Sequence, residues 1–374
     1  MNIDSIKLIH VRVPLVEPFR ISNGSVSEKD AIIVKVKADG ITGYGEASPM
    51  SGGFYSDDTP ESVWKMLVND VIPAVLASRD ISIESLNRIL QVRSRSSFAS
   101  AGIETALWDI EAQKQSTPLF AQLGGSRRCI ESGLAVGIYP TIPALLDAIG
   151  RYLSDGYKRL KIKIQPGWDV VPLAQVRCEF GDIPLMVDAN CAYTRADIDH
   201  LRALDEFGMM MIEQPLAKDD LAGHALLQSL IRTPVCLDES AKNAGAVHEA
   251  IRLKSCKIIN IKIQRVGGLQ NAKEIHDLCA EAGIPVWAGT MPELGIGAVQ
   301  TLHLASLPNF VFPTDVESSL RWFTDDIVRP LIDVRNGVIV IAEGSGNGYH
   351  PARDVIQSFK VNEIKFSGQN RVSA

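Results

Sequence analysis

The chain of 374 residues lacks several features that would assign it to a class at once. No apolar run approaches the ~20 residues needed to cross a bilayer, and there is no low-complexity segment. The N-terminal stretch MNIDSIKLIHVRVPL alternates like a strand and carries no secretory pattern. The net charge of −6 offers no excess of basic residues for nucleic acid or an acidic membrane surface. We therefore expect a cytoplasmic protein without nucleic acid or membrane partners.

Cysteine is scarce, and its spacing excludes the common cysteine-based sites. The six cysteines form no CxxC pair, and several lie inside apolar segments. Neither a structural zinc site nor a disulfide framework is expected from this pattern. Free cysteine behaves as a small apolar residue, so we predict buried free thiols.

What the chain does contain is the composition of a globular protein, with 46% apolar and 22% charged residues. Its length favours two domains or one large barrel with additions. Residues 1–60 read as three strands, 6–15, 30–40 and 41–49, with a D-G hairpin signal between the last two. Residues 60–125 read as helices, one opening at Pro60 and one over 100–115. This first region predicts an α+β unit.

From about residue 127 the pattern changes to short apolar runs separated by helix-sized gaps. Eight runs are strand candidates: 131–138, 159–164, 184–190, 209–215, 234–240, 257–263, 285–290 and 310–315. Strand–helix alternation of this kind predicts a parallel sheet, and eight such units can close into a barrel. In the remaining tail, the strand-like runs DVRNGVIVIAEG and FKVNEIKF could rejoin the first region.

Ionisable residues recur at a fixed interval along these strand candidates. Lys163, Asp188, Glu213 and Asp238 follow one another at intervals of 25, and Lys262 follows at 24. Each lies at or near the carboxyl end of its strand, which in this kind of barrel is the rim where active sites form. Buried charges cost several kcal/mol unless they are paired or metal-bound. The spacing therefore predicts a functional site at one mouth of the barrel.

The three acids of this series come from consecutive strands. Three oxygen ligands converging from neighbouring strands suit Mg²⁺, which keeps other positions for water or substrate, and Mn²⁺ is a possible substitute. Taken singly, each acid could equally be a helix cap after its strand, as in DAN or DES. Taken together and in register with two lysines, they predict metal ligands: Asp188, Glu213 and Asp238.

The run KRLKIKIQPGWD at 158–169 alternates cations with apolar residues. In an extended strand, Arg159, Lys161 and Lys163 share one face. An ammonium crowded by other cations and by a divalent ion should lose its proton more easily, so Lys163 is a candidate general base. Lys163 belongs to the second of the eight strand candidates and Lys262 to the sixth. These two strands lie on opposite sides of a barrel, so Lys262 should face Lys163 across the mouth. Removal of an α-proton from a metal-bound carboxylate would give a metal-stabilised enediolate.

The motifs LKIKIQPGWD, VDANCAY, IEQPL, CLDES and NIKIQRVGG occur in an order and spacing that resemble the enolase superfamily. Within its muconate-lactonizing subgroup, the chain looks most like the o-succinylbenzoate synthase / N-acylamino acid racemase family. The resemblance implies a (β/α)7β TIM-like barrel over 126–320. It also implies an α+β capping domain, built from residues 1–125 and completed by the C-terminal tail 321–374.

By the same resemblance, particular residues take on family roles. Lys163 and Lys262 match the acid/base pair, and Lys161 matches the auxiliary lysine that sets the pKa of its partner. Asp188, Glu213 and Asp238 match the magnesium ligands. The loops 18–25 and 49–55 match the segments that close over substrate, although they could be ordinary Gly/Ser turns. The tentative substrate-binding residues are Arg20, Phe54, Asn190, Glu239, Thr290, Met291, Glu293 and Asp315.

Several reactions remain open at this point. Two lysines on opposite faces of a carbon permit racemisation, and one lysine acting twice permits syn-dehydration to an o-succinylbenzoate-type product. A muconate-type cycloisomerase, a dipeptide epimerase and a non-catalytic binding barrel are the alternatives. Asp315 and Glu317 faintly resemble the acid-x-acid pair with which dipeptide epimerases bind an ammonium, or they could be helix-capping acids. A mandelate racemase-like site is disfavoured, because no histidine ends a barrel strand. We expect a small-molecule carboxylate substrate and a homo-oligomer.

Overall fold

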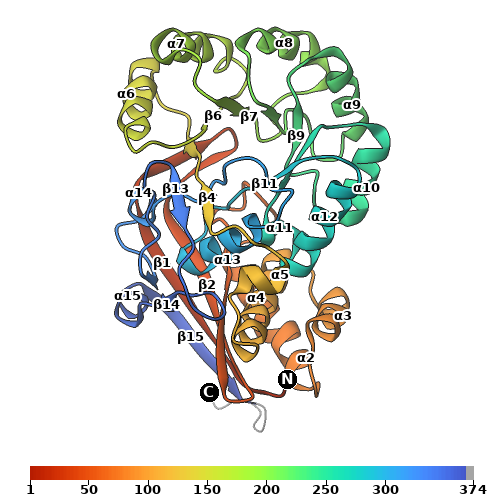
Figure 1. Ribbon diagram of the computed structural model, residues 1–374, viewed down its shortest axis with the longest axis vertical. Helices are drawn as coiled ribbons and strands as arrows, with labels where there is room; N and C mark the ends of the chain where they lie inside the picture. The colour runs from red at the N-terminus through yellow and green to blue at the C-terminus, as the bar shows by residue number, and fades with distance from the viewer. Residues whose placement is uncertain (368–374) are drawn as a thin grey trace.

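The computed structural model describes residues 1–367 and shows two regions (Figure 1). One is an antiparallel sheet with helices packed against it, and the other is a curved parallel sheet with helices around its outside. Among residues 1–367, no helix is long and apolar enough to span a membrane. The end of the predicted tail, 368–374, lies outside the described residues.

The antiparallel sheet confirms the strand pattern of the N-terminal region. Its strands, in spatial order, are β15 (Lys360–Ser367), β1 (Ile3–Ile21), β2 (Gly24–Ala38) and β3 (Ile41–Ala47). Asp39 and Gly40 join β2 to β3 with φ of 49° and 81°, the positive values that a tight hairpin turn requires. FKVNEIKF does return to this sheet, since β15 pairs with β1 from the opposite end of the chain.

Helices cover one face of this sheet. They are α1 (Pro60–Met66), a π-helical turn (Leu67–Val71), α2 (Ile72–Leu76), α3 (Ile83–Arg93) and α4 (Ser97–Lys114), whereas α5 (Leu119–Leu123) packs with the barrel core. As predicted, α1 begins at Pro60, and Thr59 caps it by accepting a hydrogen bond from the backbone N–H of Ser62. Buried apolar residues of α1 to α4 and of the sheet form one core.

The second region contains the predicted parallel strands. They are β5 (Leu134–Val136), β6 (Leu160–Lys163), β7 (Leu185–Asp188), β8 (Ile212–Glu213), β9 (Val235–Leu237), β10 (Ile258–Ile261) and β11 (Val286–Ala288), neighbours in chain order. The eighth candidate, 310–315, does not form a regular strand. It makes single bridges to β11 and to Ser132, and backbone hydrogen bonds on both sides connect the two edges of the sheet. Pro313 cannot donate to a ladder, which fits this irregular closure.

Helices fill the gaps between these strands and lie on the outside of the curved sheet (Figure 1). They are α6 (Ile142–Leu153), α7 (Val170–Phe180), α8 (Ile198–Ala203) with a 3-10 turn on either side (Arg195–Asp197 and Leu204–Phe207), α9 (Leu221–Leu230), α10 (Ala244–Leu253), α11 (Ile263–Val266), α12 (Leu269–Glu281) and α13 (Gly295–Ala305). Strand–helix units of this kind bring the carboxyl ends of all seven strands to one mouth.

The elements after the barrel strands lie against both the barrel and the antiparallel sheet region. They are α14 (Ser319–Trp322), β12 (Val328–Arg329), β13 (Val338–Val340), β14 (His350–Pro351) and α15 (Arg353–Ser358). The run DVRNGVIVIAEG does not join the antiparallel sheet, because β13 pairs instead with β4 (Cys129–Glu131). The domain boundaries at 125/126 and 320/321 stay predictions.

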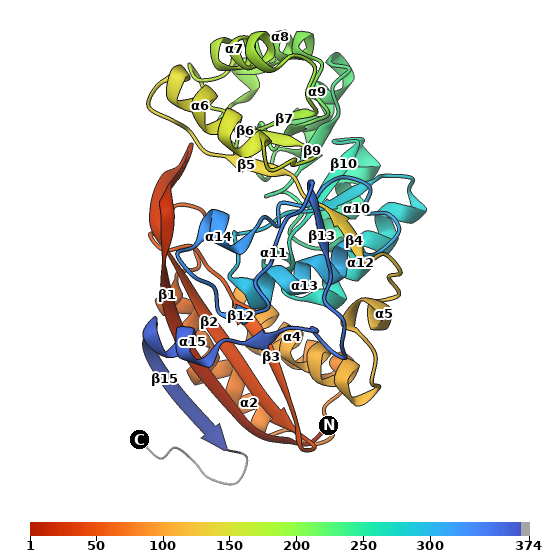
Figure 2. The ribbon, with the colours of Figure 1, turned by 60° about the vertical axis from the view of Figure 1, so that its left-hand side comes forward.

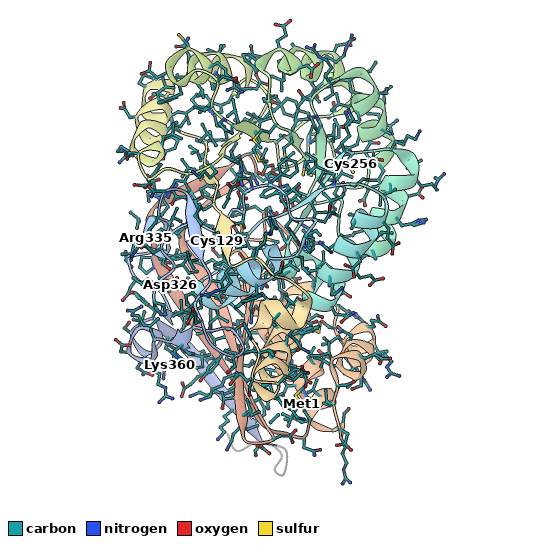
Figure 3. The ribbon with its side chains drawn as sticks, in the orientation of Figure 1. Met1, Cys129, Cys256, Asp326, Arg335 and Lys360 are labelled. Carbon is teal, nitrogen blue, oxygen red and sulfur yellow. The ribbon has the colours of Figure 1, made fainter. Side chains whose placement is uncertain are left out.

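All six cysteines lie within residues 1–367 and are free thiols there. The prediction that they are buried holds for Cys236, Cys256 and Cys279 but is wrong for Cys129 and Cys178, which are exposed. Figure 3 labels Cys129 on the short strand β4 and Cys256 ahead of β10. Ile130, the next residue of β4, is buried, so the alternation of side chains along the strand turns Cys129 toward the opposite, exposed face.

Buried acids of the N-terminal region hold it against the barrel. Glu46 accepts hydrogen bonds from the backbone N–H groups of Leu294 and Gly297 at the start of α13, both at 2.8 Å. Glu104 does the same for α12, at 2.8 Å from the N–H of Leu269 and 2.9 Å from that of Gln270. Helix N-termini favour such carboxylate partners, so these contacts fix the two regions relative to each other.

Candidate active site

The residues of the 25-residue series stand side by side at the mouth of the barrel. In the pairing of β6, β7 and β8, Lys163 is opposite Asp188 and Asp188 is opposite Glu213. Asp238 directly follows β9, and Lys262 directly follows β10. The acids are completely buried, and the lysines are no more than 6% exposed. The interval in the sequence thus corresponds to neighbouring positions on one rim.

Lys161 occupies the centre of this group. Its Nζ lies 2.7 Å from Glu213 Oε2, 3.0 Å from Asp188 Oδ2 and 3.1 Å from Asp315 Oδ2. Burial favours the neutral amine, but these three carboxylates more than offset burial and raise the pKa of Lys161. Burial likewise opposes ionisation of Asp188, yet Lys161 and Lys163 outweigh it and lower the pKa of that carboxyl.

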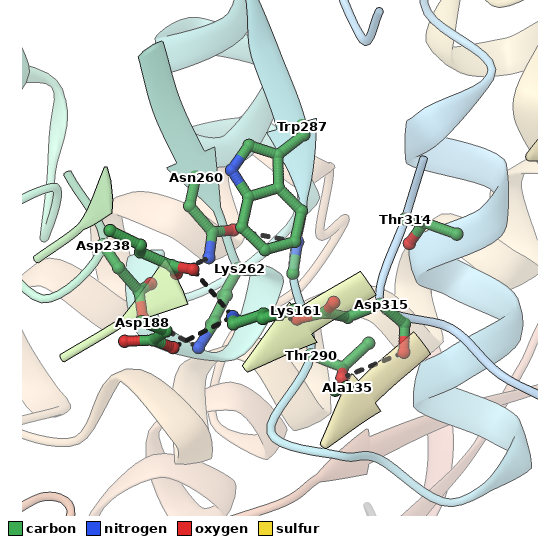
Figure 4. Close-up of polar contacts among 12 residues, drawn as sticks. Ala135, Lys161, Asp188, Asp238, Asn260, Lys262, Trp287, Thr290, Thr314 and Asp315 are labelled. Atoms are coloured by element: carbon green, nitrogen blue, oxygen red, sulfur yellow. Dashed lines mark hydrogen bonds and ion pairs between the residues drawn. The ribbon is translucent and has the colours of Figure 1, made fainter. Parts of the chain in front are cut away.

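The other two lysines lie on either side of the carboxylates. Lys163 Nζ is 2.6 Å from Asp188 Oδ2 and 2.9 Å from Asn190 Oδ1. Lys262 Nζ is 2.9 Å from Asp238 Oδ2 and 3.0 Å from the hydroxyl of Tyr55. Figure 4 shows Lys161 and Lys262 reaching into the group that contains Asp188 and Asp238.

The pKa of Lys163 is lowered, in the predicted direction but for a different main reason. Burial is the largest cause, and the repulsion by Lys161 is a smaller one that works against the attraction of Asp188. The neighbouring cations on the strand are therefore not sufficient to explain the shift. Lys262 behaves in the opposite way, because Tyr55, Glu213 and Glu239 together outweigh its burial and raise its pKa.

The floor of the site is formed by a tryptophan between two cations. Trp287 is fully buried on β11, with Lys161 Nζ 4.8 Å and the Arg159 guanidinium carbon 5.0 Å from its ring centre. Its indole N–H donates to Cys236 Sγ at 3.2 Å. Beneath it, buried side chains of β7 to β11 fill the barrel. The face shared by the cations of β6 is thus the interior face, where an aromatic ring and carboxylates offset their charge.

The side chains of Asp188, Glu213 and Asp238 contact cationic side chains of the protein. As placed, no group of three or more His, Cys, Asp or Glu side chains within residues 1–367 is gathered closely enough to hold a metal ion. Lys161 contacts both Asp188 and Glu213, while Lys262 and Arg265 contact Asp238. The donor set nevertheless suits a hard cation, since it consists of completely buried carboxylates on adjacent strands. Glu213 Oε2 accepts no hydrogen bond from residues 1–367, although it forms the ion pair with Lys161.

Asn190 links the two ends of this group. Its side-chain oxygen accepts from Lys163, and its Nδ2 donates to Glu239 Oε1 at 3.0 Å. The turn between β1 and β2 reaches the same loop, where Ser22 donates to the carbonyl of Ala189 and Asn23 to that of Asn190, both at 3.3 Å. Figure 2 shows this end of the β1–β2 pair rising toward β5 and β6. The predicted loop 18–25 therefore does contact the barrel mouth.

The predicted capping residues on these loops lie at different depths. The ring of Phe54 packs over Gly24 of the β1–β2 turn, where a Cβ would be 2.6 Å from it. Tyr55, next to it, contacts Lys262, Arg265 and Asp238. Arg20 instead has an exposed side chain and lines a separate cavity of about 300 Å³ beside Tyr139.

The loop after β11 forms another wall. Thr290 is half-buried, and its hydroxyl lies 3.5 Å from the backbone carbonyl of Asp315 (Figure 4). Met291 is buried in the core of the N-terminal region, and Glu293 is also buried, with one oxygen accepting from the Met291 N–H at 3.0 Å. Gly289 opens this loop without a side chain, since a Cβ there would lie 2.8 Å from Lys262 Cε. The stem of Lys262 therefore depends on that glycine for space.

Both acids of the acid-x-acid pair after the eighth segment already contact cationic side chains of the protein itself. Asp315 accepts from Arg159 at 2.8 Å and from Lys161 at 3.1 Å. Glu317 accepts from the backbone N–H of Ala135 at 2.8 Å and lies 3.4 Å from Arg321. Both side chains are buried, so neither the ammonium-binding interpretation nor the helix-capping one describes their contacts.

Comparisons with known proteins agree with this geometry. The family described as mandelate racemase / muconate lactonizing enzyme, N-terminal domain, matches residues 3–124, and the enolase C-terminal domain-like family matches residues 144–355. The chain is a member of the enolase superfamily. The resemblance inferred from the sequence motifs is therefore confirmed, and so is the barrel with its N-terminal cap.

Similar superfamily members include named enzymes and a solved structure. An o-succinylbenzoate synthase from Geobacillus stearothermophilus is 44% identical over 96% of each chain. An N-succinylamino acid racemase from an Amycolatopsis species is 41% identical over 95% of this chain and 97% of the relative. The crystal structure of an enolase superfamily member from Listeria innocua has a TM-score of 0.93 and 32% identity, and covers 99% and 100% of the two chains. This superfamily member is thus an enzyme among racemase- and lyase-type relatives.

Sequence reasoning missed several residues of this superfamily member's site. Asn260 donates to Glu213 Oε1 at 2.7 Å and accepts from the Gly289 N–H at 2.9 Å. Its signal was present, since Asn260 and Lys262 alternate on one face of the same strand. Tyr55 lies in the predicted loop 49–55 and Arg265 in the motif NIKIQRVGG, but neither residue was singled out, because no periodicity in the sequence reports their contacts with Asp238.

Proposed function

We propose that this enzyme removes and returns the α-proton of a carboxylate substrate, as an N-acylamino acid racemase and o-succinylbenzoate synthase. The observation that carries the proposal is the placement of Lys163 and Lys262 on either side of Lys161. Asp188 holds Lys163, Asp238 holds Lys262, and Asp315 holds Lys161 between them. The names of the 44% and 41% identical relatives support both activities. A site with two lysines serves either reaction, since the synthase step needs only one of them.

In the proposed racemisation the lysines act from opposite faces of the substrate. Neutral Lys163 takes the α-proton as the C–H bond breaks, and the ammonium of Lys262 donates a proton to the other face of that carbon. The reverse transfer serves the other enantiomer. The lowered pKa of Lys163 and the raised pKa of Lys262 fit this starting state. In the proposed dehydration Lys163 acts twice, first removing the α-proton and then protonating the departing hydroxyl, which leaves as water.

We propose that Asp188, Glu213 and Asp238 hold Mg²⁺, with Mn²⁺ as a substitute. The bound ion would neutralise the substrate carboxylate and so make the adjacent C–H more acidic. The support is the donor set, three completely buried carboxylates at the ends of adjacent strands. Lys161 forms ion pairs with two of them, Asp188 and Glu213, which compensates the burial of their charges.

For the rest of the substrate, we propose contacts from both regions. Phe54, Thr290, Met291 and Arg20 would border it on the side of the cap, and Asn190, Glu239 and Glu293 on the side of the barrel. Asp315 would act indirectly, through Lys161. Since Asp315 and Glu317 already pair with internal cations, a free substrate ammonium finds no open acid at that wall. This favours an N-acylated amine over the dipeptide of an epimerase.

We also propose a cytoplasmic homo-oligomer that acts on a small carboxylate, supported by superfamily membership alone. Light scattering on the purified enzyme would test its assembly, and a single-chain mass would end that part of the proposal.

The proposed chemistry is tested by exchange of the α-hydrogen in D₂O with Mg²⁺. A panel of N-acylamino acids, dipeptides and the synthase substrate is incubated with the wild type, Lys163→Ala and the control Lys158→Ala, an exposed neighbour. We expect exchange with N-acylamino acids, its loss in Lys163→Ala and its retention in the control. Exchange that persists in Lys163→Ala would refute the base assignment. No turnover of any panel member, with substrate still bound, would favour the non-catalytic barrel.

A further inference from the structure

A lysine outside the barrel mouth is almost completely buried at the interface between the two regions. Lys29 lies on β2 and is 4% exposed. Its Nζ donates to the carbonyl of Ser48 at 2.9 Å and lies 3.4 Å from the carbonyl of Met291. Among residues 1–367, no carboxylate lies within salt-bridge distance of it. Burying an ammonium on two carbonyls is costly, so its presence calls for a reason beyond packing.

The two carbonyls belong to the two loops that flank Lys262. Ser48 directly follows β3 and opens the loop that ends at Tyr55, whose hydroxyl is 3.0 Å from Lys262 Nζ. Met291 lies in the loop after β11, which begins at Gly289 against the stem of Lys262. We call the contacts of Lys29 with Ser48 and Met291 the Lys29 bridge. It connects both walls around one of the two proposed acid/base residues.

Further hydrogen bonds connect this bridge to α11, the helix that begins directly after Lys262. The backbone N–H of Ser48 donates to Gln264 Oε1 at 3.0 Å, and Gln264 Nε2 donates to the carbonyl of Glu46 at 2.8 Å. Gln264 lies two residues after Lys262 and is itself buried. By contrast, Lys163 is held by Asp188 and Asn190, neither of which contacts the bridge. The bridge therefore acts on one side of the mouth only.

Burial lowers the pKa of Lys29, and nearby carboxylates oppose this shift without outweighing it. Glu46 and Glu293 attract Lys29 over a longer distance, while each holds backbone N–H groups of its own. The geometry points to Lys29 as a positioning residue that sets Tyr55 and the 289–294 loop against Lys262, and so controls proton transfer on the Lys262 face. This inference rests on the proposed function of Lys262.

The test uses Lys29→Met, which keeps the length of the side chain and removes its charge. Exchange of the α-proton in D₂O is measured separately for the two enantiomers of one N-acylamino acid. The enantiomer that faces Lys262 is defined as the one whose exchange is lost in Lys262→Ala. We expect Lys29→Met to slow exchange of that enantiomer at least about tenfold more than exchange of the other, since small misplacements of a reacting group can cost ~100-fold. The control Lys37→Met, an exposed lysine on the same strand, should slow neither.

Equal slowing of both enantiomers in Lys29→Met would overturn the inference, because it would mean a general structural role. So would wild-type rates for both. If Lys29→Met does not yield folded protein, Lys29→Gln is measured in its place, and the failure of both to fold would also overturn it. Absence of exchange for either enantiomer in the wild type would refute the proposed function instead, so the two failures are distinguishable.

Discussion

Two carboxylates at the barrel mouth, Asp188 and Asp315, and two at the interface between the two regions, Glu46 and Glu104, are all buried, yet their pKa values shift in opposite directions. At the mouth, burial of Asp315 is outweighed by Lys161 and Arg159, which lower its pKa to about 2. At the interface, burial prevails and raises the pKa of Glu46 to about 8 and of Glu104 to about 7. Backbone N–H groups, unlike ammonium groups, do not outweigh burial there.

This difference separates two uses of the same residue types. Acids next to lysines stay charged and can act in chemistry, whereas acids next to helix N-termini hold two regions together. Strongly perturbed carboxyl groups often mark active sites, yet the interface acids with raised pKa values lie away from the barrel mouth. The partners of each acid, rather than its burial, distinguish the two groups here.

The largest effect should come from removing one charge at the mouth. Glu213→Gln should reduce turnover about 1,000-fold, because a catalytic metal contributes several kcal/mol and each 1.36 kcal/mol is tenfold. Calorimetric titration with Mg²⁺ should show the parallel loss of affinity. Undiminished Mg²⁺ binding would remove Glu213 from the ligand set and weaken the distinction between the two groups of acids.

The corresponding change at the interface should alter stability and leave turnover unchanged. The ordinary pKa of Glu104 is 4.5 and its folded value is about 7, so its proton stabilises the fold fully below pH 4.5. That stabilisation, about 3 kcal/mol, is lost as the pH rises through 7. Glu104→Gln should remove this dependence. Denaturant unfolding of both proteins between pH 5 and pH 8 measures it, and parallel curves would contradict the assignment.

A smaller effect is expected from replacing Asn260, an uncharged residue that donates a hydrogen bond to Glu213 at the barrel mouth. Asn260→Ala removes the 2.7 Å hydrogen bond to Glu213, and Mg²⁺ affinity or turnover should fall about 10- to 100-fold. Asn309→Ala is a matched control at the other end of the barrel, where Asn309 donates to the carbonyl of Ile284 at 2.8 Å. It should affect stability without changing Mg²⁺ affinity. Equal Mg²⁺ affinities in both variants would show that Asn260 does not orient Glu213.

The smallest effect should come from an exposed acid, which has neither burial nor a catalytic neighbour. Glu363 lies 3.0 Å from Lys7 across the β15–β1 pair, and both side chains are substantially exposed. Glu363→Gln should lower the free energy of unfolding by less than about 1 kcal/mol, since solvent screens such pairs. Thermal unfolding at low and high salt would measure this, and a loss as large as that of a buried acid would contradict the comparison.

The parts of this structure that could be predicted are those whose residues recur at a regular interval along the sequence. Alternation along β6 placed Lys161 and Lys163 on one face, and the repeat of the strand–helix unit placed Asp188 and Glu213 beside them. Each of these inferences needs only local geometry and one repeat length. The return of the last strand to the first sheet also followed from its composition.

The parts that could not be predicted depend on distant segments meeting. Glu104 contacts the start of α12, more than 160 residues away, and no pattern in either segment announces it. Asp315 was interpreted as a substrate contact, because the sequence does not show that Arg159 and Lys161 reach it across the closure of the barrel. The eighth strand was expected to be regular, but its proline permits only single bridges.

The pairing of β15 with β1 has a consequence for synthesis of the chain on the ribosome. Until Lys360–Ser367 has emerged, β1 exposes a row of unpaired N–H and C=O groups, which invites pairing with other nascent chains. The same long strand leads to the turn that touches the loop beside Asp188. The edge of β1 therefore stays uncovered until residues 360–367 have been synthesised, and a product truncated before residue 360 would be left prone to aggregation.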